Sequence, residues 1–147
     1  MSEPANALRS EVERASALFR TWGEADVIRD LGAGKWVRKE ILGHLIDSAA
    51  NNHQRFVRAR FESTFTFPGY DQEDWVSAHG YRERQWKELV DLWVSLNRHV
   101  AVAIESVPPG KLQTPCTIGD HETMPLEWWM NDYLRHLKHH VDQIEHG

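Results

Sequence analysis

Apolar side chains recur with a helical period in four long stretches of the chain. In residues 5–22, Leu8, Val12 and Phe19 recur at helical spacing and share one face. The same period predicts three further long helices, over residues 36–60, 81–106 and 125–145. Helices of this kind bury their apolar stripes against one another. The pattern therefore predicts an all-α fold, a four-helix bundle.

The longest connection lies between the second and third predicted helices. Residues 61–80 show no helical period and contain the turn pair Pro68-Gly69. Asp71 is placed to cap a short helical turn that reaches Trp75. A connection this long inside a compact domain is more often functional, or a crossover, than idle. Residues 114–123 fit either a hairpin that turns at Gly119-Asp120 or an irregular loop.

Length, charge and cysteine content narrow the class of protein. A chain of 147 residues without repeats or linkers predicts one domain, residues 1–147. The net charge is −5 and both signs are interspersed, so the sequence shows no basic patch of the kind that binds nucleic acid. No apolar run is long enough for a membrane span. The N-terminus lacks an export signal, and Cys116 is the single cysteine, which excludes an internal disulfide. We therefore expect a cytoplasmic protein.

The positions of the histidines in the sequence indicate a possible metal site. His136 and His140 lie four positions apart in the last predicted helix, about 40° apart around its axis, and project side by side. His44 lies on the second predicted helix, between the apolar stripe and a polar row. Three neutral imidazoles from facing helices can hold zinc, nickel, copper or iron and leave a position open for water or substrate. The alternative is that these histidines only fill the edge of the core.

Neighbouring polar and aromatic residues are candidates for orienting the ligands or lining a pocket. A ligating imidazole normally donates its other N–H to an oxygen atom. The candidates for this role, and for the walls of the pocket, are Asp47, Asn51, Trp129, Tyr133 and Gln143. The polar row of the second helix contains His44, Ser48, Asn51 and Arg55, and it is either a solvated face or the wall of a polar pocket.

The other six histidines have weaker claims to a metal. We interpret His139 as a surface residue or one that orients a ligand. The remaining ones are interpreted as structural or solvated, and these are His53, His79, His99, His121 and His146. Among them His121 is the strongest alternative, because it lies next to the start of the last helix.

Two motifs resemble those of the DinB-like (YfiT-like) superfamily. The run Lys39–Asp47, preceded by Trp36, resembles the second helix of that family. The run Asp132–Gln143 resembles its final-helix motif, His-x-x-His-His-x-x-Gln. The resemblance covers essentially the whole chain. It implies a four-helix bundle with an unusual crossover connection, often dimeric, and a divalent metal on three histidines, which fall here on His44, His136 and His140.

The resemblance leaves the reaction open, and we carry three hypotheses. Characterised relatives include thiol-dependent S-transferases and isomerases, so the first is a transferase in which zinc or nickel presents a low-molecular-weight thiol as thiolate. The second is a metal-dependent hydrolase with Asp47 as a candidate general base. The third is a non-catalytic metal-binding or interaction module. A small-molecule substrate and a second copy of the chain are the expected partners. Cys116 lacks a nucleophile motif.

Overall fold

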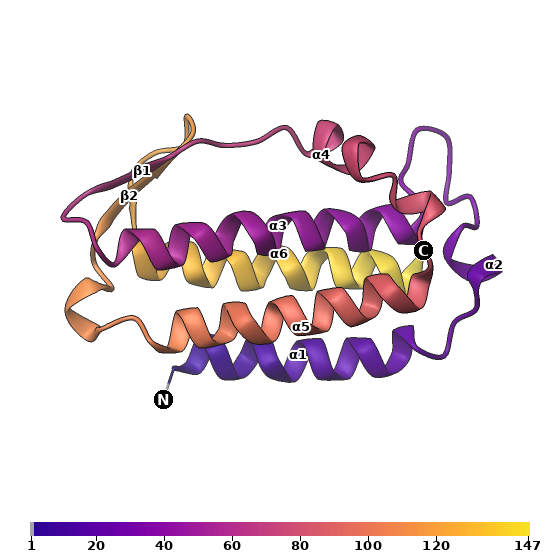
Figure 1. The fold of residues 1–147 in the computed structure, drawn as a ribbon, viewed down its shortest axis with the longest axis horizontal. Helices are drawn as coiled ribbons and strands as arrows, with labels where there is room; N and C mark the ends of the chain where they lie inside the picture. Colours follow the sequence, from indigo (N-terminus) through magenta and orange to yellow (C-terminus); the bar gives the residue numbers. More distant parts are fainter. Residues whose placement is uncertain (1) are drawn as a thin grey trace.

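Residues 2–147 of the computed structural model form a bundle of four long helices (Figure 1). The long helices are α1 (Glu3–Phe19), α3 (Arg38–Ala59), α5 (Trp86–Glu105) and α6 (Leu126–His146). Helix α1 packs against α5 and α6, and α3 packs against the same two helices. Helices α1 and α3 therefore lie on one diagonal of the bundle, and α5 and α6 lie on the other. The four helices predicted from the apolar period are confirmed.

The core consists of the apolar stripes that the sequence pattern indicated. Each long helix contributes side chains that are less than 2% exposed, and they include Leu8, Phe19, Leu42, Phe56, Trp93, Met130 and Leu137. Ser2 begins α1 by accepting a hydrogen bond from the amide of Ala5. Burial of these stripes, rather than helix propensity alone, stabilises helices of this length.

The connection between α3 and α5 returns along the outside of α3, so that α3 and α5 run in the same direction (Figure 1). We call residues 60–85 the return segment. Its elements are β1 (Phe65–Phe67), α4 (Gln72–His79) and the 3₁₀ helix η1 (Tyr81–Glu83). The Asp71 carboxylate accepts the amide of Asp74 at 2.9 Å, which confirms the predicted cap of α4.

Helix α5 begins at Trp86, five residues later than the period predicted. Tyr81 belongs to η1 instead, because its side chain is bound to α3. The hydroxyl donates to Asp47 at 2.6 Å, and the ring lies directly over Gly43. The chain is extended at Arg84 before it enters α5. A tertiary contact thus interrupts a segment that is helical by its pattern.

A small three-stranded sheet lies at one end of the bundle. Strand β2 (Pro115–Ile118) pairs antiparallel with β3 (Met124–Pro125), so the hairpin alternative for residues 114–123 is confirmed. Strand β2 also pairs in parallel with β1, which the pattern did not predict. A strand of three residues is too short to show an alternating period. The remaining short elements are α2 (Glu24–Val27) and η2 (Pro109–Lys111).

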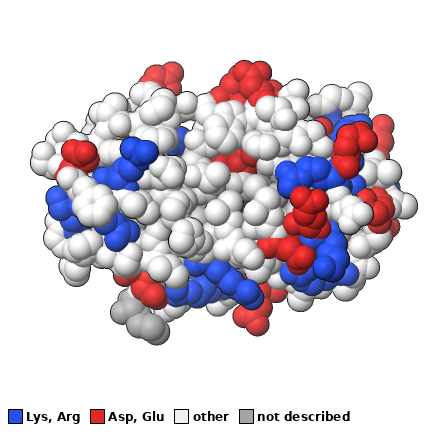
Figure 2. Space-filling view, viewed as in Figure 1, with Lys and Arg blue, Asp and Glu red and all other residues white. Residues whose placement is uncertain are grey.

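The surface carries charges of both signs. Figure 2, viewed as in Figure 1, shows lysine and arginine side chains interspersed with aspartate and glutamate around the rim of the visible face. Within residues 2–147, no helix combines the length and the hydropathy that crossing a bilayer requires.

Candidate metal centre

Three histidines meet between α3 and α6. His44 comes from α3, and His136 and His140 come from one face of α6. The Nε2 atom of His136 lies 3.2 Å from Nε2 of His44 and 3.1 Å from Nε2 of His140. One ring nitrogen of each residue lies within 4.8 Å of those of the other two. The fold thus brings together the three residues that the sequence indicated as ligands.

The spacing of these nitrogens fits a shared ion. Two imidazole nitrogens bound to one tetrahedral zinc, each about 2.05 Å from it, lie about 3.3 Å apart. The observed separations of 3.1 and 3.2 Å are close to that value. Three ring nitrogens that point at one another repel unless a cation or a proton lies between them. The donor set therefore fits a divalent ion of the kinds that imidazole prefers.

The three imidazoles are neutral at physiological pH. Burial, reinforced by the neighbouring imidazoles, lowers the pKa of His44 to about 3. Burial and the proximity of His140 lower the pKa of His136 to about 4. The pKa of His140 is also lowered, mainly by burial and against the effect of its hydrogen bond to Gln143. Neutral imidazole is the form that binds metal, so the site needs no proton release at neutral pH.

Gln143 orients His140. Its Oε1 atom lies 2.7 Å from Nδ1 of His140. An amide oxygen only accepts hydrogen bonds, so this contact favours the tautomer of His140 with its proton on Nδ1 and the lone pair of Nε2 toward the other two histidines. His44 is 2% exposed and is covered by the Trp36 ring, with the ring centroids 5.1 Å apart. Gln143 thus orients His140 through a hydrogen bond, whereas Nδ1 of His44 is buried without a hydrogen-bond partner among the described residues, and packing holds its ring.

Arg38 ties the ends of the two ligand-bearing helices together. It lies in the first turn of α3, is 7% exposed, and donates from Nε to the carbonyl oxygen of Ile144 at 2.7 Å. Arginine at the C-terminal end of a helix satisfies carbonyls that have no partner within the helix. This contact fixes α6 against the start of α3, one turn beyond His140, and so holds His44 opposite His140.

Asp47, the candidate base, faces the return segment. One of its carboxylate oxygens accepts the Tyr81 hydroxyl at 2.6 Å and lies 3.1 Å from Nδ1 of His79. The side chain is 2% exposed, and burial raises its pKa. It does not line the cleft beside His140. We therefore interpret Asp47 as an anchor for the return segment; the sequence did not indicate its contact with His79.

Three other predicted pocket residues have their polar atoms engaged elsewhere. The Asn51 amide donates to a backbone carbonyl one turn earlier in α3, at 2.9 Å. The Tyr133 hydroxyl donates to Asn97 of α5 at 2.5 Å. The Trp129 indole donates to the carbonyl of Cys116 at 3.1 Å. None of the three lines the cleft beside His140.

The polar row of α3 is buried. All four residues, His44, Ser48, Asn51 and Arg55, are at most 9% exposed, so the solvated-face alternative is wrong. The return segment contacts the far end of this row. Arg55 donates to the carbonyl of Pro68 at 3.4 Å, and its guanidinium lies 5.9 Å from the centre of the Tyr70 ring.

A cleft of about 450 Å³ opens beside His140. Trp36 contributes an aromatic wall, and its indole N–H donates to Glu73 of α4 at 3.2 Å. The other lining residues are Leu31, Gly34, Lys35, Ile41, Gln72, Asp142, Gln143, His146 and Gly147. Sequence reasoning missed Glu73 because it comes from the return segment, where no period links it to the histidines. Among the lining residues, His140 and Gln143 carried a signal through the final-helix motif, and Trp36 through its place just before the second-helix motif.

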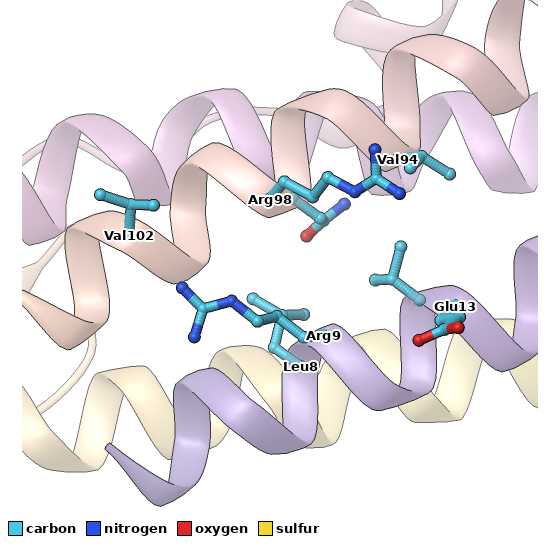
Figure 3. Close-up of a pocket in the computed structure, with 8 residues that line it drawn as sticks. Leu8, Arg9, Glu13, Val94, Arg98 and Val102 are labelled. Atoms are coloured by element: carbon cyan, nitrogen blue, oxygen red, sulfur yellow. The ribbon is translucent and has the colours of Figure 1, made fainter. Parts of the chain in front are cut away.

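A second groove, of about 370 Å³, lies between α1 and α5. Figure 3 shows Arg9 and Glu13 on α1 and Arg98 on α5 along this groove. Its lining contains neither histidine nor cysteine. The groove therefore offers no imidazole or thiolate ligand to a metal.

The remaining histidines are not part of the three-histidine cluster. His53 and His99 stack on each other across α3 and α5, with ring centroids 4.5 Å apart. His139 is exposed, and its ring meets that of His140 edge-on at 5.1 Å. His121 packs against Trp129 at 4.9 Å.

Comparison with known proteins agrees with the fold. YfiT from Bacillus subtilis, described as a probable metal-dependent hydrolase with an unusual four-helix bundle topology, superimposes with a TM-score of 0.83 at 18% identity. The match covers 99% of this chain and 87% of that one, and at this identity it shows the shared fold. No curated protein matches the chain significantly. The family model of the DinB superfamily matches residues 7–144. The chain therefore belongs to the DinB superfamily.

Proposed function

We propose that the protein is a metal-dependent hydrolase whose divalent ion is held by His44, His136 and His140. The observation that carries the proposal is the convergence of three neutral imidazoles beside an open cleft. Such an ion, when bound, lowers the pKa of a coordinated water and polarises the carbonyl of an ester or amide. The similarity in fold to YfiT, described as a probable metal-dependent hydrolase, supports this choice.

The chain's own residues prepare the cleft for a substrate with an apolar part. Trp36 and Ile41 give it apolar walls next to His140. Gln143 keeps the lone pair of His140 directed toward the other two histidines. Neither Asp47 nor Cys116 lines the cleft, so the proposal assigns no chemical step to either residue.

We also propose that the return segment is the crossover connection that the family resemblance implies. It closes one side of the site, because α4 supplies Glu73 to Trp36 and Trp36 lies on His44. Asp47 and Tyr81 fasten its far end to α3. In this arrangement the crossover is a fixed wall of the cleft.

The thiol-dependent transferase expected from the sequence stays a prediction, as do the preference for zinc or nickel and the homodimer. The same three histidines could present a thiolate, so the two reactions share one site and differ in the nucleophile. An activity assay that separates the two reactions is therefore run both with and without a thiol.

The first test is metal content. Protein purified without an affinity tag is analysed for its elements alongside His44→Ala and His136→Ala. His53→Ala is the matched control, since it also removes a histidine from α3 but lies outside the cluster. We expect about one ion per chain in the wild type and in the control, and loss of the ion in both ligand variants. Equal metal content in all four proteins would contradict the proposed site.

The second test separates the two reactions. The metal-loaded protein is assayed against a panel of activated esters and amides, with and without a low-molecular-weight thiol. We expect hydrolysis that needs no thiol and is lost in His44→Ala. Turnover that requires the thiol, with the thiol found in the product, would replace the hydrolase by the transferase.

A further inference from the structure

The cleft beside His140 has two carboxylates in its lining, from different elements. Glu73 comes from α4 and Asp142 from α6. Among the residues that the structure describes, neither forms an ion pair with a lysine or arginine. Glu73 accepts a hydrogen bond from the neutral indole of Trp36 at 3.2 Å, and Asp142 lies 3.1 Å from His146, which is charged only when protonated. Both carboxylates are exposed, and neither is engaged by a permanently charged side chain of the described residues.

The same cleft has an aromatic wall. Trp36 is half-buried, with its ring tilted over that of His44 and its N–H bound to Glu73. An indole face attracts a cation through its quadrupole, and tryptophan does so more strongly than other aromatic residues. A carboxylate next to an indole is thus a combination that recognises an organic cation.

Lys35 is the one lysine or arginine in the lining, and its side chain folds back on its own loop. Its Cδ atom lies 3.2 Å from the position that a Cβ on Gly32 would occupy. It does not form an ion pair with Glu73 or Asp142 within the described chain. Among the side chains of the lining alone, two carboxylates thus stand against one lysine, so their fixed charge is negative on balance.

We propose that this cleft takes amphipathic esters or amides that carry a protonated amine near the bond to be cleaved. Glu73 and Asp142 bind the ammonium group, and the apolar part of the substrate packs on Trp36 and Ile41. The proposal rests on the hydrolytic function proposed above, and it adds the substrate class and the residues that select it.

Binding of matched inhibitors tests the inference without knowledge of the natural substrate. Three hydroxamates of equal size are used, one with a primary amine, one neutral and one with a carboxylate, because the hydroxamate group binds the metal in each. Calorimetry on the zinc-loaded protein gives their affinities. We expect the amine compound to bind roughly fivefold to tenfold more tightly than the neutral one, in line with exposed ion pairs and cation–π contacts. The carboxylate compound should bind more weakly than the neutral one.

Variants assign the preference to the named residues. Glu73→Gln and Asp142→Asn should each reduce the ratio of amine to neutral affinity. Asp74→Asn is the matched control, since it removes a charge of the same sign from α4 outside the cleft, and it should keep the ratio. Zinc content is measured first in every variant.

The failures of the two proposals are distinguishable. If zinc binds at the three histidines but the amine compound has no advantage over the neutral one, or if Asp74→Asn changes the ratio as much as Glu73→Gln, the substrate class is wrong and the metal site stands. If the wild type binds no zinc, the proposed function fails and this inference fails with it.

Discussion

At the scale of single residues, Gly43 constrains the surroundings of His44 most tightly. The Tyr81 ring lies where a side chain at position 43 would be, with its nearest carbon 2.0 Å from the position of a Cβ. Glycine therefore lets η1 approach the backbone of α3 one residue away from a proposed ligand. The family-like run Lys39–Asp47 includes this glycine, but nothing in the sequence indicated the ring that covers it.

Gly43→Ala should destabilise the protein. The ring cannot yield easily, because the atoms in the way include the Cγ of Tyr81, near the base of its side chain. We expect a loss of roughly 1–2 kcal/mol in the free energy of unfolding, the cost of overpacking less the helix propensity gained. Urea unfolding of the metal-free protein measures it. Gly110→Ala, where the added methyl group meets open space, should change little; an equally stable Gly43→Ala would show that the ring moves freely.

Cys116 should be inert in the folded protein. Its thiol donates to the carbonyl of Thr114, the residue is 1% exposed, and burial raises the pKa of the thiol to about 11. Thiolate is the reactive form, so a disulfide reagent at pH 7 should modify it only on unfolding. Titration with a chromogenic disulfide in native buffer and in urea checks this. Rapid reaction in native buffer would mean that the β2 region opens.

At the scale of elements, the helices were predictable and the contacts between distant segments were not. Each long helix is amphipathic over several turns, so its period is visible in the sequence. The start of α5 and the pairing of β1 with β2 depend instead on segments far apart in the chain. The same division holds at the site. The histidine pair of α6 follows from helical spacing and His44 from its place on α3, whereas Glu73 reaches the cleft only through the path of the return segment.

Tyr81→Phe should loosen the return segment. It removes the hydroxyl that donates to the buried carboxylate of Asp47, and a buried acceptor that loses its donor costs about 1–3 kcal/mol. Hydrogen exchange followed by mass spectrometry should show faster exchange in α4 relative to α1. Tyr133→Phe removes a comparable buried hydroxyl between α6 and α5, so it should leave the ratio of the exchange rate in α4 to that in α1 unchanged. Uniform acceleration in both variants would contradict the anchoring role of Tyr81.

At the scale of the whole molecule, the site lies near the end of the bundle at which the start of α3 meets the end of α6. Arg38 links the start of α3 to the end of α6, and the cleft collects residues from the loop before α3, from α4 and from α6. A bundle whose ligands come from different helices couples metal binding to global folding. Three buried neutral histidines should therefore influence the stability of the metal-free protein as a whole.

Stability of the metal-free protein should fall on acidification. The pKa values of His44 and His136 in the folded state are about 3 and about 4, below the ordinary value of 6.5. The unfolded chain binds more protons than the folded one below that ordinary value, so stability decreases as the pH falls from about 6.5 toward about 4. We expect each group to contribute about 1–2 kcal/mol of this loss by pH 5.

Urea unfolding at pH 7.5 and pH 5 measures this effect. The double variant His44→Gln, His136→Gln should show a flatter dependence on pH. His146→Gln, which removes an exposed histidine at the end of α6, serves as the control and should keep the wild-type dependence. Equal slopes in all three proteins would show that the buried imidazoles are not the cause.

The most direct test of the metal centre is an anomalous difference map from crystals of the zinc-loaded protein, with data collected on both sides of the zinc absorption edge. We expect one strong peak per chain, within about 2.0–2.2 Å of the Nε2 atoms of His44, His136 and His140, with a coordination position open to the cleft. A peak elsewhere, such as between His53 and His99, or no peak at the three histidines, would contradict it.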